Sequence, residues 1–177
     1  MTIYDSLKFI RKHNSHYEKA DIERANENYE LLCEILSKNG LTIAKKAEES
    51  SVSAKISEDY HDLNLWFQST VMPCEVVTLS IIAMKISPEN FDNARIICSY
   101  FNRAVPHGAF YFEDTLECIT FRDSLMSDSK NIGKEDFEYF LNNTVYSVNL
   151  CYNSVHLLSR GQVTMEEILA DFLADEE

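Results

Sequence analysis

Residues 76–126 read VVTLSIIAMKISPENFDNARIICSYFNRAVPHGAFYFEDTLECITFRDSLM and place a strand, a helix and a hairpin in immediate succession. Apolar residues between positions 76 and 86 fall on both sides of an extended chain, which predicts a strand covered on both faces and central in its sheet. The segment 87–89, Ser-Pro-Glu, is typical of a helix start, because the Ser87 side chain can accept a bond from a free backbone amide. The helix is expected to run to about Val105.

A hairpin is predicted directly after this helix. Its buried face is expected to consist of alternating apolar residues from the two strands, namely Phe110, Phe112, Ile119 and Phe121. Tyr111 and Arg122 then point to the opposite face. A long helix is expected over residues 137–158, because apolar residues recur there at steps of three and four, and Gly161 follows it.

The N-terminal half predicts one helix and three strands. Apolar spacing indicates a helix over residues 17–38, and Asn39-Gly40 supplies a left-handed stop. Beyond this stop the period changes to alternation, which predicts short strands around residues 41–43 and 52–56 and a further strand over 63–71.

Trp66 stands out in the strand predicted for residues 63–71. The apolar residues of this strand share one face, whereas Trp66 lies between Asn64 and Gln68 on the polar face. A large aromatic side chain in that position indicates either a second covering layer or a binding surface. Cover from the chain's own N-terminal arm or C-terminal helix is as good an explanation as a partner, and Tyr111 and Arg122 are candidates for the same surface.

Composition limits the class of protein. The chain has 177 residues, 16 Lys and Arg against 29 Asp and Glu, and a formal net charge of -13, which predicts one acidic globular domain. This acidity disfavours binding to nucleic acid or anionic membranes. We expect a cytoplasmic protein, since no apolar run is long enough for a membrane span and no export signal is recognisable. The five scattered cysteines are expected to be reduced thiols.

The sequence contains only weak evidence for catalytic or metal sites. The four glycines are isolated, and no serine lies in a GxSxG pattern. His13 with His16, and the acidic cluster around His61, are better interpreted as solvated loops, so neither a metal nor a cofactor is predicted. The cysteines are expected to pack in the core, although a small enzyme that uses Cys98 or Cys118 with a histidine stays an alternative.

The order of these elements resembles the YbjN-like family, whose fold is similar to that of type III secretion chaperones. The resemblance lies in residues 76–126 and in the long helix with YFLNNTVYSVNLCYNSV at residues 139–155. It implies an α+β fold, an antiparallel sheet of about five or six strands with helices packed on it, self-association, and a binding role without catalytic residues. The chain departs from the simplest chaperone order by one more candidate strand before Ser87 and by a helical extension after Gly161.

Three regions are therefore expected: an N-terminal arm over residues 1–16, a YbjN-like domain over 17–161, and a C-terminal helical extension over 162–177. Thr164 and Glu167 form a candidate capping box for that extension.

The leading hypothesis is a chaperone-like or regulatory protein that binds a peptide or protein partner through Trp66, Tyr111 and Arg122. A homodimer is expected as well, because the long helix has more apolar positions than one small sheet can cover. Its predicted interface residues are Phe140, Val145 and Tyr152. The alternative function is an acidic, immunity-type antagonist of a basic toxin or enzyme.

Overall fold

The computed structural model describes residues 19–57, 62–70, 75–83, 86–126, 132–164, 166–168 and 170. The predicted N-terminal arm with His13 and His16, the cluster around His61 apart from Asp62, and Cys74 lie outside the described residues, as does most of the C-terminal extension. No helix among the described residues is long and apolar enough to cross a membrane.

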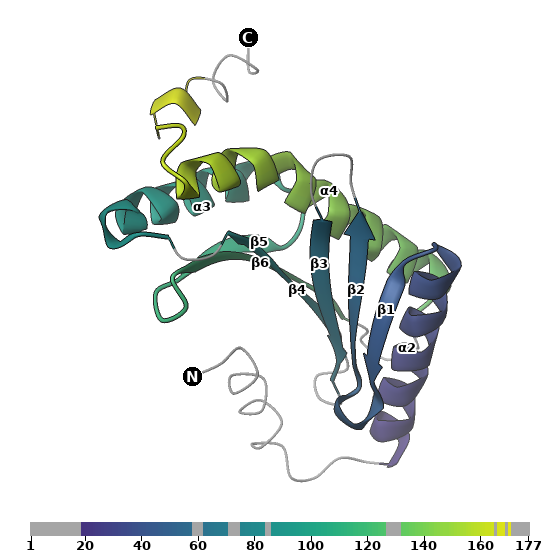
Figure 1. Cartoon of the computed structure of the whole chain (residues 1–177). Helices are drawn as coiled ribbons and strands as arrows, with labels where there is room; N and C mark the ends of the chain where they lie inside the picture. Colours follow the sequence, from purple (N-terminus) through teal and green to yellow (C-terminus); the bar gives the residue numbers. More distant parts are fainter. Residues whose placement is uncertain are drawn as a thin grey trace. The chain divides into compact units, whose positions relative to one another are not determined.

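Six strands form one sheet in the order β1-β2-β3-β4-β6-β5 (Figure 1). The strands are β1 (Thr42–Lys46), β2 (Ser51–Ser57), β3 (Asp62–Ser69), β4 (Glu75–Ala83), β5 (Ala109–Glu113) and β6 (Cys118–Met126). The helices are α2 (Lys19–Lys38), α3 (Phe91–Ala104) and α4 (Lys134–Ser159). The predicted α+β fold with an antiparallel six-stranded sheet is confirmed, and β4 is central in it.

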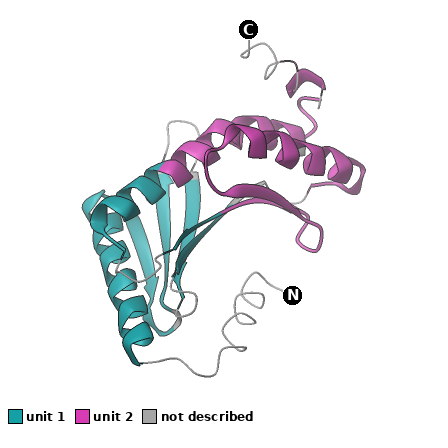
Figure 2. Ribbon diagram, turned by 180° about the vertical axis from the view of Figure 1, so that it is seen from behind, with its two compact units in different colours: residues 1–80, 123–142 teal, residues 81–122, 143–177 magenta. Residues whose placement is uncertain are grey.

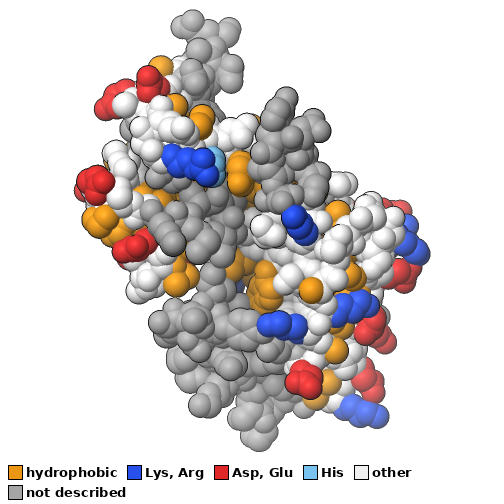
Figure 3. Space-filling model, viewed as in Figure 1, with side chains coloured by type: hydrophobic (Ala, Val, Ile, Leu, Met, Phe, Trp, Pro, Cys, Tyr) orange, Lys and Arg blue, Asp and Glu red, His pale blue; other side chains and the backbone are white. Residues whose placement is uncertain are grey.

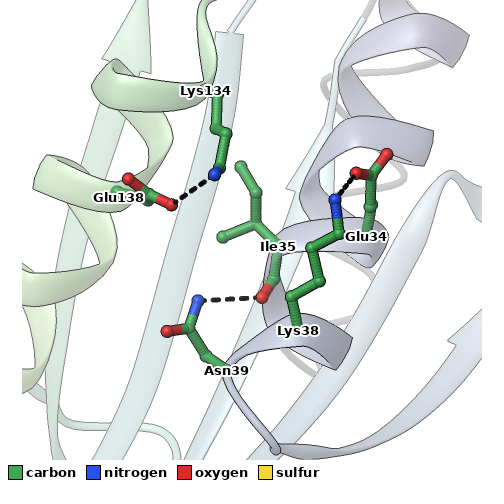
Figure 4. Close-up of polar contacts among 6 residues, drawn as sticks. All are labelled: Glu34, Ile35, Lys38, Asn39, Lys134 and Glu138. Atoms are coloured by element: carbon green, nitrogen blue, oxygen red, sulfur yellow. Dashed lines mark hydrogen bonds and ion pairs between the residues drawn. The ribbon is translucent and has the colours of Figure 1, made fainter.

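Helix α2 ends as the sequence predicts. Gly40 adopts a left-handed backbone with φ 76°. The Leu41 amide donates to the Leu36 carbonyl at 3.2 Å, which closes the helix in the manner of a Schellman motif. The Asn39 side chain donates to the Ile35 carbonyl at 2.9 Å (Figure 4). The chain therefore turns sharply from α2 into β1.

The first of two compact units comprises residues 1–80 and 123–142 (Figure 2). One face of its strands carries Leu65 and Phe67, which are 1% and 0% exposed. The Phe67 ring meets Phe140 of α4 edge to face, with 6.3 Å between the ring centroids. The Ser69 hydroxyl donates to the Ala25 carbonyl at 2.8 Å and so ties β3 to α2.

Two ion pairs of this unit lie at the surface. Lys38 pairs with Glu34 on α2, and Lys134 pairs with Glu138 on α4 at 3.2 Å (Figure 4). The Lys38 ammonium group lowers the pKa of Glu34, chiefly through their hydrogen bond. Exposed pairs four residues apart stabilise a helix only slightly, so packing holds this unit together.

The second unit comprises residues 81–122 and 143–177. Its β5–β6 hairpin has the predicted register, with Phe110 opposite Phe121 and Phe112 opposite Ile119. The Phe110 ring lies 4.9 Å from that of Phe121 and 5.7 Å from that of Phe101 on α3. The hairpin and α3 therefore share one aromatic core.

The two predicted caps have different outcomes. Ser87 makes no capping bond to a backbone amide. A 3₁₀ turn (Pro88–Asn90) precedes α3, and the Ser87 hydroxyl accepts from the side-chain amide of Asn90 at 3.1 Å. The predicted role of Ser87 is therefore wrong in this detail. The capping box is confirmed, because the Thr164 amide donates to the Glu167 carboxylate at 2.7 Å and the Glu167 amide donates to the Thr164 hydroxyl at 3.2 Å.

Candidate polypeptide-binding surface

Trp66 lies on the face of β3 opposite to the buried core. Its neighbours Leu65 and Phe67 point into the first unit, so the alternation of a strand directs Trp66 to the other face. There it is half-buried. In the view of Figure 1, β2 and β3 lie in front of α4, and Figure 3 therefore looks onto the face of these strands that is turned away from α4.

The strand register gives Trp66 one apolar and one small polar neighbour. Trp66 pairs with Leu79 of β4 and with Ser53 of β2. Leu79 is half-buried, Ser53 is exposed, and Val77 beside them is only 2% exposed. We call Trp66, Leu79 and Ser53 the sheet patch. It offers a partly exposed apolar surface with a small residue at its side, against which another chain can pack.

Lysines lie on the same face as the sheet patch. The register places Lys55 opposite Asn64, two residues along β3 from Trp66, and Lys46 opposite Ser51. On the face shown in Figure 3, orange apolar side chains lie beside both blue Lys and Arg side chains and red carboxylates. The face that carries the sheet patch therefore includes the basic side chains of Lys46 and Lys55.

Tyr111 and Arg122 belong to the second unit. Tyr111 pairs with Thr120 and Ala109 pairs with Arg122, so Tyr111 and Arg122 are diagonal neighbours on one face of the hairpin. Tyr111 is 48% exposed and Arg122 is exposed as well. These two predicted residues are thus accessible and close to each other, and they form a second candidate surface.

The outer edge of β5 is partly closed by a side chain. The Asn102 amide nitrogen on α3 donates to the Phe110 carbonyl at 3.0 Å, and the Phe110 amide donates to the Asn102 oxygen at 2.6 Å. Asn102 thereby occupies the two backbone groups that an added strand would use at this residue. This edge is a poor site for adding a strand from a partner.

The other edge strand, β1, is open but short. Four of its five residues are exposed, and Lys45 and Lys46 end it. Lysines on a short edge strand oppose pairing with further strands. Of the surfaces that a partner could use, the sheet patch combines apolar character with access better than either edge does.

The four cysteines among the described residues are buried and have raised pKa values. Burial raises the pKa of Cys98 to about 12 and that of Cys118 to about 11, with the Glu113 carboxylate adding to the second shift. Burial also raises the pKa of Cys33 and Cys151. A nucleophilic cysteine needs the opposite shift, toward a thiolate near neutral pH. The structure thus supports core packing for these thiols.

Potential metal-binding side chains do not cluster in the described part of the chain. Among these residues, no group of three or more His, Cys, Asp or Glu side chains could hold a metal ion. Two histidines lie among the described residues. His107 is exposed, and His156 stacks on Tyr152 with 5.5 Å between ring centroids.

The residues predicted for a dimer interface lie at different depths. Phe140 is 4% exposed and packs on Phe67 inside the first unit. Val145 and Tyr152 are half-buried. The most exposed apolar residues of α4 are different ones, and sequence reasoning missed them: Tyr139, Tyr146, Leu150 and Leu157. The sequence feature that could have indicated an exposed apolar surface on α4 is the absence of any Asp, Glu, Lys or Arg over residues 139–159.

Comparison with known proteins identifies the fold. No family model and no curated protein matches the chain. The solved structures that are similar to it include the following two. YbjN from E. coli, a candidate transcription regulator, is 11% identical with a TM-score of 0.53, over 68% of this chain and 85% of its own. The ExsC–ExsE complex is 14% identical with a TM-score of 0.52, over 72% of this chain and 92% of the matched chain.

These similarities confirm the expected YbjN-like, type III secretion chaperone-like fold. At such low identity they establish the fold alone, since one fold can carry many functions.

Proposed function

We propose that this chain is a non-catalytic module that binds an apolar segment of another polypeptide on the sheet patch. The observation that carries the proposal is the half-buried Trp66 beside Leu79, on the face of the sheet opposite to the packed core. Tryptophan dominates many protein interfaces, because it contributes a large contact area at a low cost in side-chain entropy.

Two further observations support this function. A solved structure similar to the chain is the ExsC–ExsE complex, so the same fold is found within a complex of proteins. The buried thiols with raised pKa values also offer no activated nucleophile.

The test uses the single tryptophan of the chain as its reporter. A dye-labelled peptide with alternating apolar residues is titrated onto the protein, and binding is followed by anisotropy and by Trp66 emission. A matched peptide with serine at the apolar positions serves as its control. We expect saturable binding of the apolar peptide, a blue shift of Trp66 emission, and about tenfold weaker binding after Trp66→Ser, the loss typical of an interface hot spot.

A matched variant checks that the effect is local. Ile22→Ser removes an apolar side chain that is 43% exposed on α2 and should leave the peptide affinity unchanged. Tyr111→Ser tests whether the second candidate surface contributes. Unchanged Trp66 emission at saturation, or equal affinities for Trp66→Ser and wild type, would show that Trp66 is covered by its own chain or does not bind. Binding that weakens steeply with salt and does not depend on Trp66 would instead favour the acidic antagonist.

A further inference from the structure

Lys45 is a charged residue on the side of the sheet that carries the core of the first unit. It pairs with Val52 of β2, and Val52 pairs with Phe67, so these three side chains share one face. Helix α2 packs against β1 on this face. Lys45 itself is exposed, because β1 is the edge strand of the sheet. The Lys45 side chain therefore lies where the edge of the sheet meets α2.

Helix α2 places a thiol and a phenol next to Lys45. Tyr29 and Cys33 are one turn apart on the helix and are 4% and 1% exposed. The Lys45 ammonium group and the Tyr29 hydroxyl are both within hydrogen-bonding reach of the Cys33 thiol. No oxygen or nitrogen atom of the described chain bonds to the Tyr29 hydroxyl. A buried phenol and a lysine thus meet at one sulfur atom.

This setting distinguishes Cys33 from the other three described cysteines. Burial raises the pKa of all four thiols, but only at Cys33 does a cation act in the opposite direction. The hydrogen bond from Tyr29 and the charge of Lys45 both lower the pKa of Cys33, against a smaller rise caused by Glu30. A nearby cation favours the thiolate, which is the form that peroxides oxidise. Cys33 is therefore the described cysteine best placed for oxidation.

The position of Cys33 beneath an edge strand also affects access to its sulfur. The side chain next to the sulfur is the exposed Lys45, and exposed side chains change rotamer within nanoseconds. Movement of this one surface side chain is enough to admit a molecule as small as hydrogen peroxide. The same lysine carries an amine, which is a nucleophile once it has lost its proton. An oxidised sulfur at Cys33 would therefore form beside a group that can attack it.

We infer that Cys33 and Lys45 form a modification site at which hydrogen peroxide joins the Cys33 sulfur to the Lys45 nitrogen. Peroxide first converts the thiol to a sulfenic acid, as its O–O bond breaks and one water leaves. The Lys45 nitrogen then attacks the sulfur. The S–N bond of a sulfenamide forms, the S–O bond breaks, and a second water and one proton leave. In total the sulfur is oxidised by two electrons and the peroxide is reduced to water.

The cross-link ties β1 to α2 on the core side of the sheet. Trp66 and the rest of the sheet patch lie on the opposite face, so this inference does not depend on polypeptide binding there. A sulfenamide is reversible, because a thiol reductant attacks its sulfur and releases the amine. The edge strand is therefore expected to be fastened under oxidising conditions and released under reducing ones.

Peptide mass spectrometry of the full chain tests the cross-link. Wild type is incubated with millimolar hydrogen peroxide for several hours and digested with trypsin in the absence of reductant. Lys38 lies between the two residues, so trypsin cuts the chain that connects them. We expect a linked pair of peptides that joins Cys33 to Lys45 and is lighter than the two free peptides together by two hydrogen atoms. Dithiothreitol should split this pair.

Three variants separate the roles of charge and amine. Lys45→Arg keeps the positive charge, but a guanidinium is not a nucleophile, so Cys33 should stop at the sulfenic acid, which dimedone traps. Lys46→Arg lies on the opposite face of β1 and is the matched control, which should give the wild-type yield of linked peptides. Lys45→Met should slow oxidation of Cys33 about tenfold, because the thiolate loses its cation. Circular dichroism verifies that every variant is folded.

The melting temperature gives a second readout. The link closes a short loop between α2 and β1, so peroxide-treated wild type should melt roughly 5–10 °C above peroxide-treated Lys45→Arg. Cys33 that stays unmodified, or that is oxidised without a bond to Lys45, would overturn the inference. Faster oxidation of another described cysteine would overturn it as well. Peptide binding at the sheet patch is measured on untreated protein, so failure of the cross-link and failure of the proposed function are distinguishable.

Discussion

Adjacent residues on β3 have opposite roles. Phe67 is fully buried and contacts Phe140, whereas Trp66 is half-buried on the other face beside Leu79. The alternation of a strand is enough to predict this difference from the sequence, because the neighbours of Trp66 on its own face are polar. The identity of Leu79 as its partner could not be predicted, since it depends on the register between β3 and β4.

The buried thiols should make the protein sensitive to alkali. The pKa of Cys98 is raised to about 12 and that of Cys118 to about 11, from 9.0, because burial disfavours the thiolate. Between pH 9 and 11 the unfolded chain loses these protons while the folded chain keeps them. The unfolded state then binds fewer protons, so the free energy of unfolding falls as pH rises, by up to about 1.4 kcal/mol per pH unit for each thiol.

Urea unfolding at a series of pH values between about 7 and 11 measures this fall. At pH values below the pKa of a thiol in the unfolded chain, the cysteines should not make the free energy of unfolding depend on pH. Cys118→Ala should reduce the fall of the free energy of unfolding at alkaline pH by about the contribution of one thiol. It should not change the pH dependence near neutrality. A described cysteine that reacts rapidly with a thiol reagent in the native protein at neutral pH would contradict the assignment and would support the enzyme alternative.

At the level of elements, Asn102 completes the edge of the hairpin. It offers one donor and one acceptor to the backbone of Phe110, as a neighbouring strand would. Asn102→Ala should destabilise the protein by about 1–2 kcal/mol, because both backbone groups lose their partner beside a buried aromatic core. It should also increase aggregation, because the bare edge can pair with other chains.

Denaturant unfolding and light scattering measure these two effects. Asn102→Asp keeps the acceptor for the Phe110 amide but has no donor for its carbonyl, so the free energy of unfolding should lie between those of wild type and Asn102→Ala. Ile96→Ala, on the exposed side of the same helix, should change stability by less than about 0.5 kcal/mol. If Asn102→Ala is as stable as wild type, water replaces the amide and the edge is not closed by Asn102.

The sequence predicts most elements but not their polar details. The hairpin register follows from alternating aromatic residues, and the stop of α2 follows from Gly40 with its left-handed backbone. The bond from Asn102 to Phe110 could not be predicted, because it joins a helix to a strand through tertiary packing. Ser87 had the right residue type for a cap, but a 3₁₀ turn displaced the helix start and its hydroxyl accepts from Asn90 instead.

At the scale of the whole molecule, net charge bears on the homodimer that the sequence predicts. Each chain carries -13 at neutral pH, and residues 139–159 of α4 offer no opposite charge to offset the repulsion. Dimerisation should therefore strengthen with salt, because added ions shorten the range of the repulsion while leaving apolar packing intact. We expect the dissociation constant of the dimer to fall several-fold between about 20 mM and about 300 mM NaCl.

Sedimentation equilibrium across this salt range decides between two kinds of contact. A charge-complementary interface weakens as salt screens its attraction, whereas a neutral interface between two acidic chains strengthens. Sodium chloride suits this test, because strongly excluded salts such as sulfate would also enhance apolar burial and obscure the cause. A dissociation constant that rises with NaCl would show that attractive charges hold the copies together, and these must then lie outside the uncharged residues 139–159.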